Sequence, residues 1–340
     1  MKLVSYKNID GNVKLGILLD NQIADLGFYS NKLGLTVPDN MLDFLRGGIS
    51  NMDKAKEISQ KLLSMGFEST HTNHPLLAPI PNPPSCRDGY AFRQHVASAR
   101  RNRGVDMIKE FDQYPIFYFT NHNAVFGSGD VLIENDHLHK LDFELEWAAI
   151  IGKKGRNISS AEADNYIAGF TIMNDWSART LQMEEMLLNL GPAKGKDFAT
   201  TIGPYLITPD ELEDTLIKTT FGNQYSLKMK AFHNGKQISE GNTKDMTWTF
   251  AEIIERVSYG VDIFPGDIIG SGTVGTGCYL ELNGTWSRQA KDKGENFEPI
   301  WLKNNDFMTL EIDLLGKLEN KVLLSENNIS ILNKKKNVNN

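Results

Sequence analysis

Residues 141–147 alternate between apolar and acidic side chains, in the order Leu-Asp-Phe-Glu-Leu-Glu-Trp. As a β-strand, this segment would present four apolar side chains on one face and Asp142, Glu144 and Glu146 on the other. Three carboxylates with no Lys or Arg among them repel one another. Such a face suits either solvent or a hard cation such as Mg²⁺, Ca²⁺ or Mn²⁺, which prefers carboxylate oxygens. Solvent is the commoner outcome for an isolated acidic strand, so the remaining sequence decides between the two.

Length and composition indicate a globular protein. The chain has 340 residues, of which 40% are hydrophobic and 23% charged, enough for one large domain or two of unequal size. The net charge of −7 argues against a nucleic-acid partner. Cys86 and Cys278 are too few for a disulfide framework or a thiolate zinc site, and they fit a reducing compartment. No apolar run has membrane-spanning length and residues 1–20 lack a signal-peptide pattern, so we expect a cytoplasmic protein without a membrane partner.

Turn and breaker residues divide the chain. Asp10-Gly11 separates two short strands in a predicted hairpin, and Gly47-Gly48 separates two helices within residues 40–65. Five prolines between positions 75 and 84 indicate a linker. We therefore predict a small β-containing N-terminal domain over residues 1–80, a larger domain over 81–332, and a frayed polar tail over 333–340.

The larger part is predicted to be rich in strands. Its expected strands lie at residues 115–119, 131–133, 141–151, 167–173, 204–208, 226–233 and 278–283, and its clearest helix lies at 249–259. The regular strand–helix alternation of a parallel α/β fold is missing. The predicted class is therefore mainly β, of the α+β type.

Five short motifs occur in one order between Asp88 and Glu281. They read Asp-x-Tyr-x-x-Arg-Gln-His, Phe-Glu-Leu-Glu, Met-Asn-Asp-Trp-Ser-Ala-Arg, Gly-Lys-x-Phe-x-Thr-Thr and Ser-Gly-Thr. Each is weak alone, but the collinear set resembles the fumarylacetoacetate hydrolase family over more than half of the chain. The resemblance implies a mixed β-sandwich roll for the larger domain, and a homodimer.

The resemblance also implies a metal centre. It places a divalent cation, with Mg²⁺ the first choice and Ca²⁺ or Mn²⁺ as alternatives, among the carboxylates of Asp88, Glu144, Glu146 and Asp175. Glu144 and Glu146 are two residues apart, so a strand would point both to the same side. Asp142 would then support the site from outside. Lys196 and Thr200 match two further positions of the family's metal centre.

Catalytic and substrate-binding roles follow from the same resemblance. His95 matches the family's general base, which deprotonates water, and Glu281 matches the carboxylate that orients it. Arg179 and Gln182 match residues that contact substrate oxygens, and their i, i+3 spacing fits one helix face. The resemblance further assigns two substrate-binding residues, Thr273 to a carboxylate and Tyr90 to the pocket wall. The family's substrate-binding arginine after His95 has no counterpart in register, since Arg103 lies one position away, and Tyr118 is the candidate for a second pocket tyrosine.

These assignments predict a metal-dependent hydrolase that cleaves a carbon–carbon bond in a small 1,3-diketo acid of the fumarylacetoacetate or acylpyruvate type. Lys196, Arg179 and Gln182 would stabilise the developing oxyanion or the departing carbanion. One alternative is a hydratase, isomerase or decarboxylase of a related keto acid on the same fold. Another is a metal-stabilised binding protein without catalysis, which would leave His95, Lys196 and Arg179 unexplained. The segment 270–275 also fits the dinucleotide pattern G-x-G-x-x-G, but that motif requires a following helix, and the sequence predicts a strand there.

Overall fold

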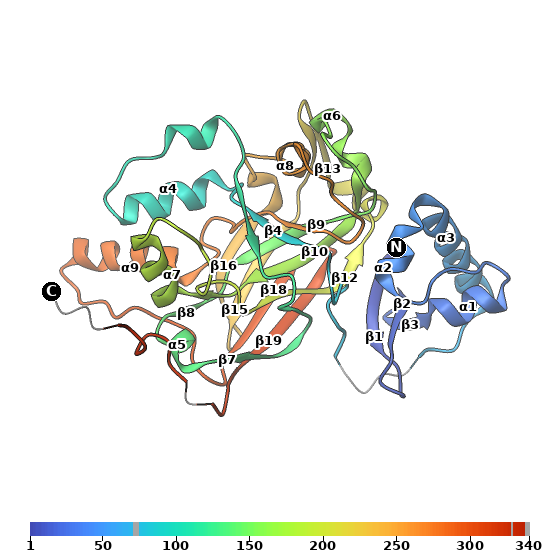
Figure 1. The fold of residues 1–340 in the computed structure, drawn as a ribbon, viewed down its shortest axis with the longest axis horizontal. Coiled ribbons are helices and arrows are strands. Elements are labelled where there is room, and N and C mark those ends of the chain that lie inside the picture. Colours follow the sequence, from blue (N-terminus) through green and yellow to red (C-terminus); the bar gives the residue numbers. More distant parts are fainter. Residues whose placement is uncertain (71–74, 328, 337–340) are drawn as a thin grey trace.

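A computed structural model describes residues 1–70, 75–327 and 329–336. Within these residues, two main sheets pack against each other at the centre of the molecule (Figure 1). The larger sheet has the strand order β3 (Gln22–Asp25), β2 (Val13–Leu19), β1 (Lys2–Lys7), β12 (Thr200–Ile207), β10 (Ile167–Asp175), β9 (Leu145–Ile151), β17 (Ile268–Gly270), β4 (Cys86–Gly89) and β5 (Phe117–Thr120), with β6 (Val125–Phe126) beside β12.

The second sheet has the order β16 (Lys236–Asn242), β15 (Lys228–His233), β18 (Phe307–Ile312), β19 (Gly316–Leu324) and β7 (Gly129–Ile133). Two short pairs complete the strands: β8 (Leu141–Asp142) with β11 (Ser177–Ala178), and β13 (Leu216–Thr219) with β14 (Gly222–Tyr225).

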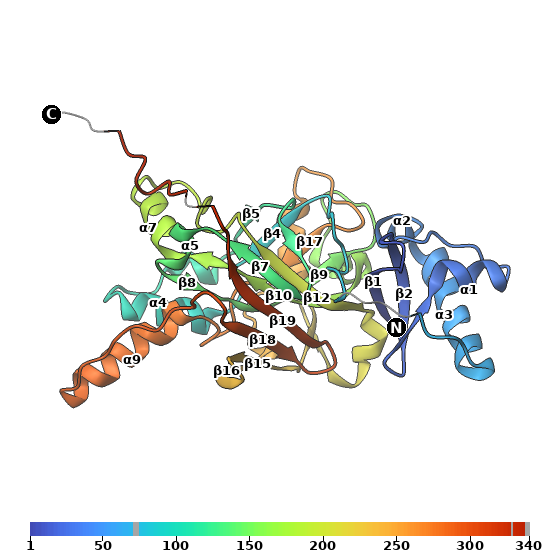
Figure 2. The same ribbon diagram turned by 90° about the horizontal axis from the view of Figure 1, so that it is seen from below.

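The helices are α1 (Leu26–Lys32), α2 (Met41–Arg46), α3 (Gly48–Met65), α4 (Arg93–Asn102), α5 (Asn135–Leu138), α6 (Ser160–Ala163), α7 (Arg179–Leu187), α8 (Phe250–Ser258) and α9 (Tyr279–Lys293). Short 3-10 turns lie at Lys109–Asp112, Asp164–Tyr166, Pro209–Thr215 and Thr243–Asp245. Helices α4, α7 and α9 gather at the end of the molecule opposite α1, α2 and α3 (Figures 1 and 2). No helix in the described part of the chain is both long enough and apolar enough to cross a membrane.

The expected strand-rich mixed architecture with a β-containing N-terminal region is confirmed. The hairpin of β1 and β2 forms, and helices α2 and α3 meet at Gly47 as predicted. Strand β1 also pairs with β12 through Leu3 and Leu206, so the N-terminal strands extend the larger sheet. The domain boundary near residue 80 stays a prediction. Of the predicted tail, residues 337–340 lie outside the described residues.

The predicted strand at 278–283 is wrong, because these residues begin helix α9. The alternating pattern is overridden by a tertiary contact: the carboxylate of Asp142 accepts hydrogen bonds from the backbone N–H groups of Tyr279 (2.7 Å) and Leu280 (2.9 Å). A carboxylate at this position satisfies free N–H groups and interacts favourably with the helix dipole. A distant residue therefore fixes the start of α9.

Helix α9 follows residues 270–275, where a strand was predicted, so the predicted strand no longer argues against a dinucleotide site there. Within the described residues, another feature excludes that site. After α9 the chain continues into β18 of the other sheet, so no strand–helix–strand unit exists. Gly272 moreover donates its N–H to the Asp88 carboxylate (3.1 Å), beside buried acids that would repel a pyrophosphate.

The predicted strand at 141–151 forms in two pieces, β8 and β9, with Phe143 and Glu144 between them. At the break, side-chain oxygens accept hydrogen bonds from backbone N–H groups that would otherwise pair with a neighbouring strand. The N–H of Phe143 donates to Asp142 Oδ1 (2.9 Å) and the N–H of Glu144 donates to Asn174 Oδ1 (2.9 Å). The acidic residues are all buried, so the solvent-exposed interpretation of this segment does not hold.

Trp147 anchors the core between the sheets. Its ring stacks on Phe170 at a centroid distance of 4.9 Å and meets Phe250 edge-on at 4.8 Å. The side chain is 1% exposed. Trp147 lies one residue after Glu146 on β9, so core packing on one face of this strand holds the acids on the other.

We predict that Trp147→Ala lowers the free energy of unfolding by about 3–5 kcal/mol, because it leaves a large cavity in a packed core. Urea denaturation measures this change. Phe307→Ala is the control, since this side chain is 53% exposed, and it should change stability little. Equal effects of the two substitutions would show that Trp147 does not anchor the core.

Candidate active site

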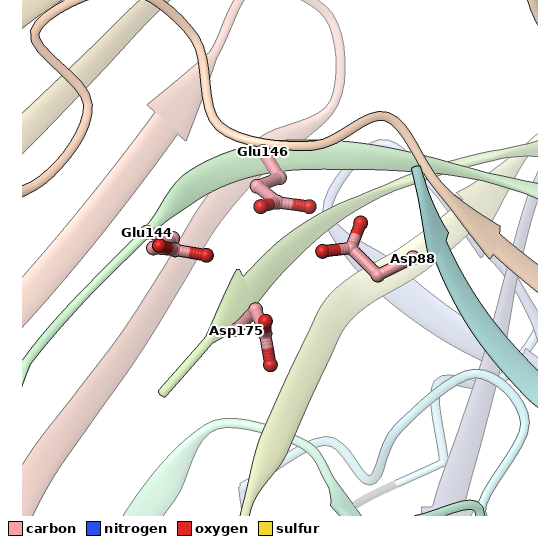
Figure 3. A group of neighbouring side chains, drawn as sticks. All are labelled: Asp88, Glu144, Glu146 and Asp175. Atoms are coloured by element: carbon pink, nitrogen blue, oxygen red, sulfur yellow. The ribbon is translucent and has the colours of Figure 1, made fainter. Parts of the chain in front are cut away.

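Four buried carboxylates converge at the centre of the larger sheet, and we call Asp88, Glu144, Glu146 and Asp175 the acidic cluster (Figure 3). One oxygen from each residue lies within 4.8 Å of the others. Asp88 comes from β4, Glu146 from β9 and Asp175 from the end of β10, while Glu144 comes from the break before β9. None of the four residues is more than 6% exposed. The structure therefore brings together the four acids that the sequence singled out.

Strand pairing explains why distant acids meet. Glu146 on β9 lies opposite Met173 on β10, two residues before Asp175. Strand β17 lies between β9 and β4 and pairs Gly270 with Asp88. A Cβ at Gly270 would lie 2.4 Å from Asp88 Oδ1, so this position needs glycine for the Asp88 carboxylate to reach the cluster.

Burial and mutual repulsion shift the protonation of the cluster. Burial, followed by the charge of Asp175, raises the pKa of Asp88 to about 7. Burial and the charges of Asp88 and Glu144 raise the pKa of Glu146 well above its ordinary value. Burial also raises the pKa of Asp175. Burial opposes ionisation of Glu144 as well, but the neighbouring Lys196 and Arg179 outweigh it and lower its pKa.

Two buried cations partly balance the acids. The Lys196 ammonium lies 2.6 Å from both Glu144 Oε2 and Asp175 Oδ2. The Arg179 guanidinium lies 2.8 Å from Glu144 Oε1 and also 2.8 Å from Asp142 Oδ2. Burial lowers the pKa of Lys196, but the adjacent carboxylates reverse that effect and raise it, so this residue stays charged. A protonated ammonium has no lone pair, so Lys196 pairs with the acids in this structure, and its part in the metal centre stays a prediction.

The acidic cluster fits a divalent cation. Glu146 Oε2 and Asp175 Oδ1 are buried without a hydrogen-bond partner, as is Thr200 Oγ1. Buried polar atoms almost always have partners, so unpaired oxygens beside excess negative charge indicate a missing positive ligand. All-oxygen donors suit Mg²⁺, Ca²⁺ or Mn²⁺. The four acids would hold the ion, and Thr200 lies beside them as predicted.

His95 and Glu281 form a buried pair across helices α4 and α9. His95 Nδ1 lies 2.7 Å from Glu281 Oε2, which also accepts a hydrogen bond from the Thr276 N–H (3.0 Å). Because a carboxylate only accepts, Nδ1 carries the hydrogen and Nε2 keeps its lone pair. This arrangement suits a base held in one orientation by a carboxylate.

A cavity of about 690 Å³ connects these groups. The predicted residues that line it are Asp88, Tyr90, His95, Glu144, Arg179, Gln182, Lys196 and Thr273. Glu146, Asp175, Thr200 and Glu281 lie behind this lining. Gln182 accepts a hydrogen bond from Arg179 Nη1 (3.0 Å), as their spacing on α7 predicted. The residues assigned to metal, base and substrate thus share one cavity.

The structure places two further residues at the site, Tyr118, which the sequence offered as a candidate, and Arg103, which lies out of register with the family's arginine. The Tyr118 hydroxyl donates a hydrogen bond to Asp175 Oδ2, and Arg103 lies at the cavity wall. Ala99, Ile116 and Phe117 add apolar lining near these residues. A further apolar part of the lining, which we call the outer wall, consists of Met183, Met186, Pro192, Leu280, Pro299 and Trp301. The outer wall comes from three separate segments without a shared motif, so only the folded chain reveals it.

Comparisons with known proteins identify the family of this chain. The family model described as fumarylacetoacetate (FAA) hydrolase C-terminal matches residues 85–323. The chain is 30% identical to oxaloacetate tautomerase FAHD2A of Bos taurus, covering 85% of this chain and 81% of the relative. It is 26% identical to oxaloacetate tautomerase YisK of Bacillus subtilis, covering 91% and 95%.

Solved structures show the same fold. A fumarylacetoacetate hydrolase from Exiguobacterium antarcticum superposes with a TM-score of 0.65 at 22% identity, covering 96% of this chain and 100% of that one. A probable 2-hydroxyhepta-2,4-diene-1,7-dioate isomerase from Mycobacterium abscessus superposes with a TM-score of 0.66 at 23% identity and the same coverage.

We predict that Glu146→Gln lowers the affinity for Mg²⁺ by at least about tenfold, because even residues outside the ligand shell affect metal affinity by about 10–100-fold. Isothermal titration calorimetry measures the affinity. Glu298→Gln, which removes an exposed carboxylate, is the control and should bind Mg²⁺ like the parent protein. Unchanged affinity in Glu146→Gln would place the ion elsewhere.

The raised pKa of Asp88 predicts a pH dependence for the metal-free protein. Between the ordinary pKa of 3.8 and about 7, the folded state keeps a proton that the unfolded chain releases. The contribution of Asp88 to stability is therefore present below about pH 4 and is lost as the pH rises through 7. Urea unfolding in EDTA measures the free energy of unfolding at pH 5 and at pH 7.5. This free energy should fall more between the two pH values in the parent protein than in Asp88→Asn. Identical losses would contradict the pKa shift.

Proposed function

The chain belongs to the fumarylacetoacetate hydrolase family, and from that premise we propose that it is a metal-dependent tautomerase of oxaloacetate or a close 2-oxo dicarboxylate. One observation carries the proposal: His95 of the His95–Glu281 pair lines the same cavity as Asp88 and Glu144 of the acidic cluster. The names of the relatives, oxaloacetate tautomerases that are 26–30% identical over most of their length, support oxaloacetate as the substrate.

Tautomerisation of oxaloacetate transfers one proton between carbon C3 and the oxygen on C2, with no net gain or loss of atoms. His95 Nε2 has the free lone pair needed to accept the proton from C3. Glu281, hydrogen-bonded to Nδ1, stabilises the imidazolium that forms. The imidazolium then returns the same proton to the C2 oxygen, which completes the enol. The reverse order converts the enol to the ketone.

Charge stabilisation comes from the groups at the cavity floor. The acidic cluster would hold a divalent cation, which would act as a Lewis acid on the substrate's oxygens. Lys196 and Arg179 lower the pKa of Glu144 and hold its carboxylate in place. Arg179 is already paired with Asp142 and Glu144, so it acts mainly by positioning them. Gln182 accepts from Arg179, which leaves its amide N–H groups available to a substrate oxygen.

Hydrolysis of a carbon–carbon bond in an acylpyruvate is the second candidate, and the outer wall favours it. Oxaloacetate carries a carboxylate at each end and gains little from apolar side chains, whereas an acyl group would bury apolar surface against Met183 or Leu280. In this reaction, His95 would deprotonate water, which attacks the acyl carbonyl. Cleavage of the adjacent carbon–carbon bond then yields a carboxylic acid and, after protonation, pyruvate.

A single assay separates the two reactions. The enol absorbance of oxaloacetate, acetylpyruvate, fumarylpyruvate and fumarylacetoacetate is followed with Mg²⁺ and then with EDTA, and the products are identified. A Mg²⁺-dependent approach to keto–enol equilibrium with oxaloacetate intact supports the tautomerase. Release of two acids from a diketo acid supports the hydrolase. No change with any of the four, with Mg²⁺ bound and the protein folded, would overturn both candidates.

We predict that His95→Ala lowers kcat/KM by about 10²–10⁴-fold, the usual contribution of a general acid–base group. Mg²⁺ affinity should remain unchanged, because His95 lies outside the acidic cluster. Stopped-flow kinetics and calorimetry measure the two quantities. The control is His122→Ala, which removes an exposed histidine and should keep full activity. Full activity in His95→Ala would exclude His95 as the base.

A further inference from the structure

Helices α4 and α9 touch at two places, and the catalytic pair is only one of them. His95 and Asn102 are seven residues apart on α4 and so lie on one face, two turns from each other. Glu281 and Gly284 likewise share one face of α9. The first contact is the hydrogen bond between His95 and Glu281. The second is formed by Asn102 and Gly284.

We propose that Asn102 and Gly284 position the catalytic pair, and we call their contact the helix clasp. This inference rests on the proposed role of His95 as the base. Asn102 Nδ2 donates to the carbonyl oxygen of Glu281 (3.0 Å) and lies 3.4 Å from Thr285 Oγ1. Glu281 is therefore bound to α4 twice, through its carboxylate by His95 and through its backbone by Asn102. Together the two bonds fix the distance and rotation of α4 relative to α9.

Gly284 allows the two helices to approach. A Cβ at this position would lie 2.5 Å from Asn102 Nδ2 and 2.7 Å from Asn102 Cβ, which is closer than real side chains pack. The backbone of Gly284 has no positive φ, so its conformation does not call for glycine. Glycine in a helix interior also destabilises the helix relative to alanine. The close packing of Asn102 is thus the physical reason for glycine here.

The clasp matters because it joins α9 directly to α4, whereas Asp142 and Ile300 hold α9 to other parts of the chain. Helix α4 lacks a side-chain cap at its N-terminus, and the residues that follow it, 103–106, are exposed. Helix α9 projects from the body of the molecule, with only Tyr279, Glu281, Leu282 and Asn283 buried (Figure 2). Asn102 Oδ1 is buried without a hydrogen-bond partner, which destabilises the folded state, whereas Nδ2 donates to the Glu281 carbonyl oxygen.

The test uses the full chain and compares Asn102→Ala, Asn102→Asp and Gly284→Ala. Asn102→Asp keeps the side-chain shape but removes the N–H donor. Each variant should lower kcat at least tenfold with less than a twofold change in KM and in Mg²⁺ affinity. Arg101→Ala, an exposed neighbour on α4, is the matched control and should change none of these. A kcat within twofold of the parent in both Asn102 variants would overturn the proposal.

A double substitution tests the contact itself. Once Asn102→Ala has removed the side chain, the Cβ of Gly284→Ala has space, so the second change should lower kcat by less than a further twofold. Independent effects, with the full loss from Gly284→Ala repeated in the Asn102→Ala background, would contradict a shared clasp.

A readout without turnover separates this inference from the proposed function. NMR of the imidazole groups should show a protected Nδ1–H proton for His95, assigned by its loss in His95→Ala. This proton should exchange faster in Asn102→Ala and Gly284→Ala but not in Arg101→Ala. If no substrate is turned over and this pattern appears, the clasp stands while the proposed function fails. Unaltered exchange in both clasp variants would overturn the clasp alone.

Discussion

Repulsion among the four buried carboxylates of the acidic cluster is the constraint on which the rest of the site depends. Lys196 and Arg179 are buried beside them because uncompensated charges would not remain ionised there. Arg179 in turn needs Asp142 as its second partner, and the same carboxylate binds the first N–H groups of α9. Since α9 carries Glu281, successive charge interactions through Arg179 and Asp142 connect the acidic cluster to the catalytic pair. With all four carboxylates ionised, Lys196 and Arg179 would still leave negative charge in excess, which a divalent cation would balance.

The acidic cluster and the cavity residues could be anticipated because each lies in a short motif whose spacing reflects local geometry. Glu144 and Glu146 face one side as their two-residue spacing predicted, and Arg179 bonds to Gln182 one helical turn away. Helix α9 could not be anticipated. Its first residues alternate like a strand, and the Asp142 carboxylate that caps it lies 137 residues earlier in the chain. Local patterns do not record contacts of that range.

The other residues missed from sequence share this cause. Asn102 has no motif, and its role appears only when Gly284 brings α9 against α4. The outer wall is likewise assembled from the α7 region, α9 and the segment before β18. The outer wall also bears on the choice between hydrolysis and tautomerisation. The motifs favoured hydrolysis, the relatives favour tautomerisation, and both reactions require the same oriented base beside the same acidic cluster. The outer wall would contact the far end of the substrate, where oxaloacetate and an acylpyruvate differ.

Titration of Mg²⁺ into metal-stripped protein, in buffers of different ionisation enthalpy, tests the central claim most directly. Asp88, with a pKa of about 7, and Glu146, with its raised pKa, hold protons that a cation must displace. The account predicts that one ion binds per chain at pH 6.5 and that binding releases protons. The number of protons released should fall as the pH rises. The double variant Asp88→Asn/Glu146→Gln should lose both the proton release and the tight binding. Binding without proton release, or unchanged binding in that double variant, would contradict a metal centre at the acidic cluster.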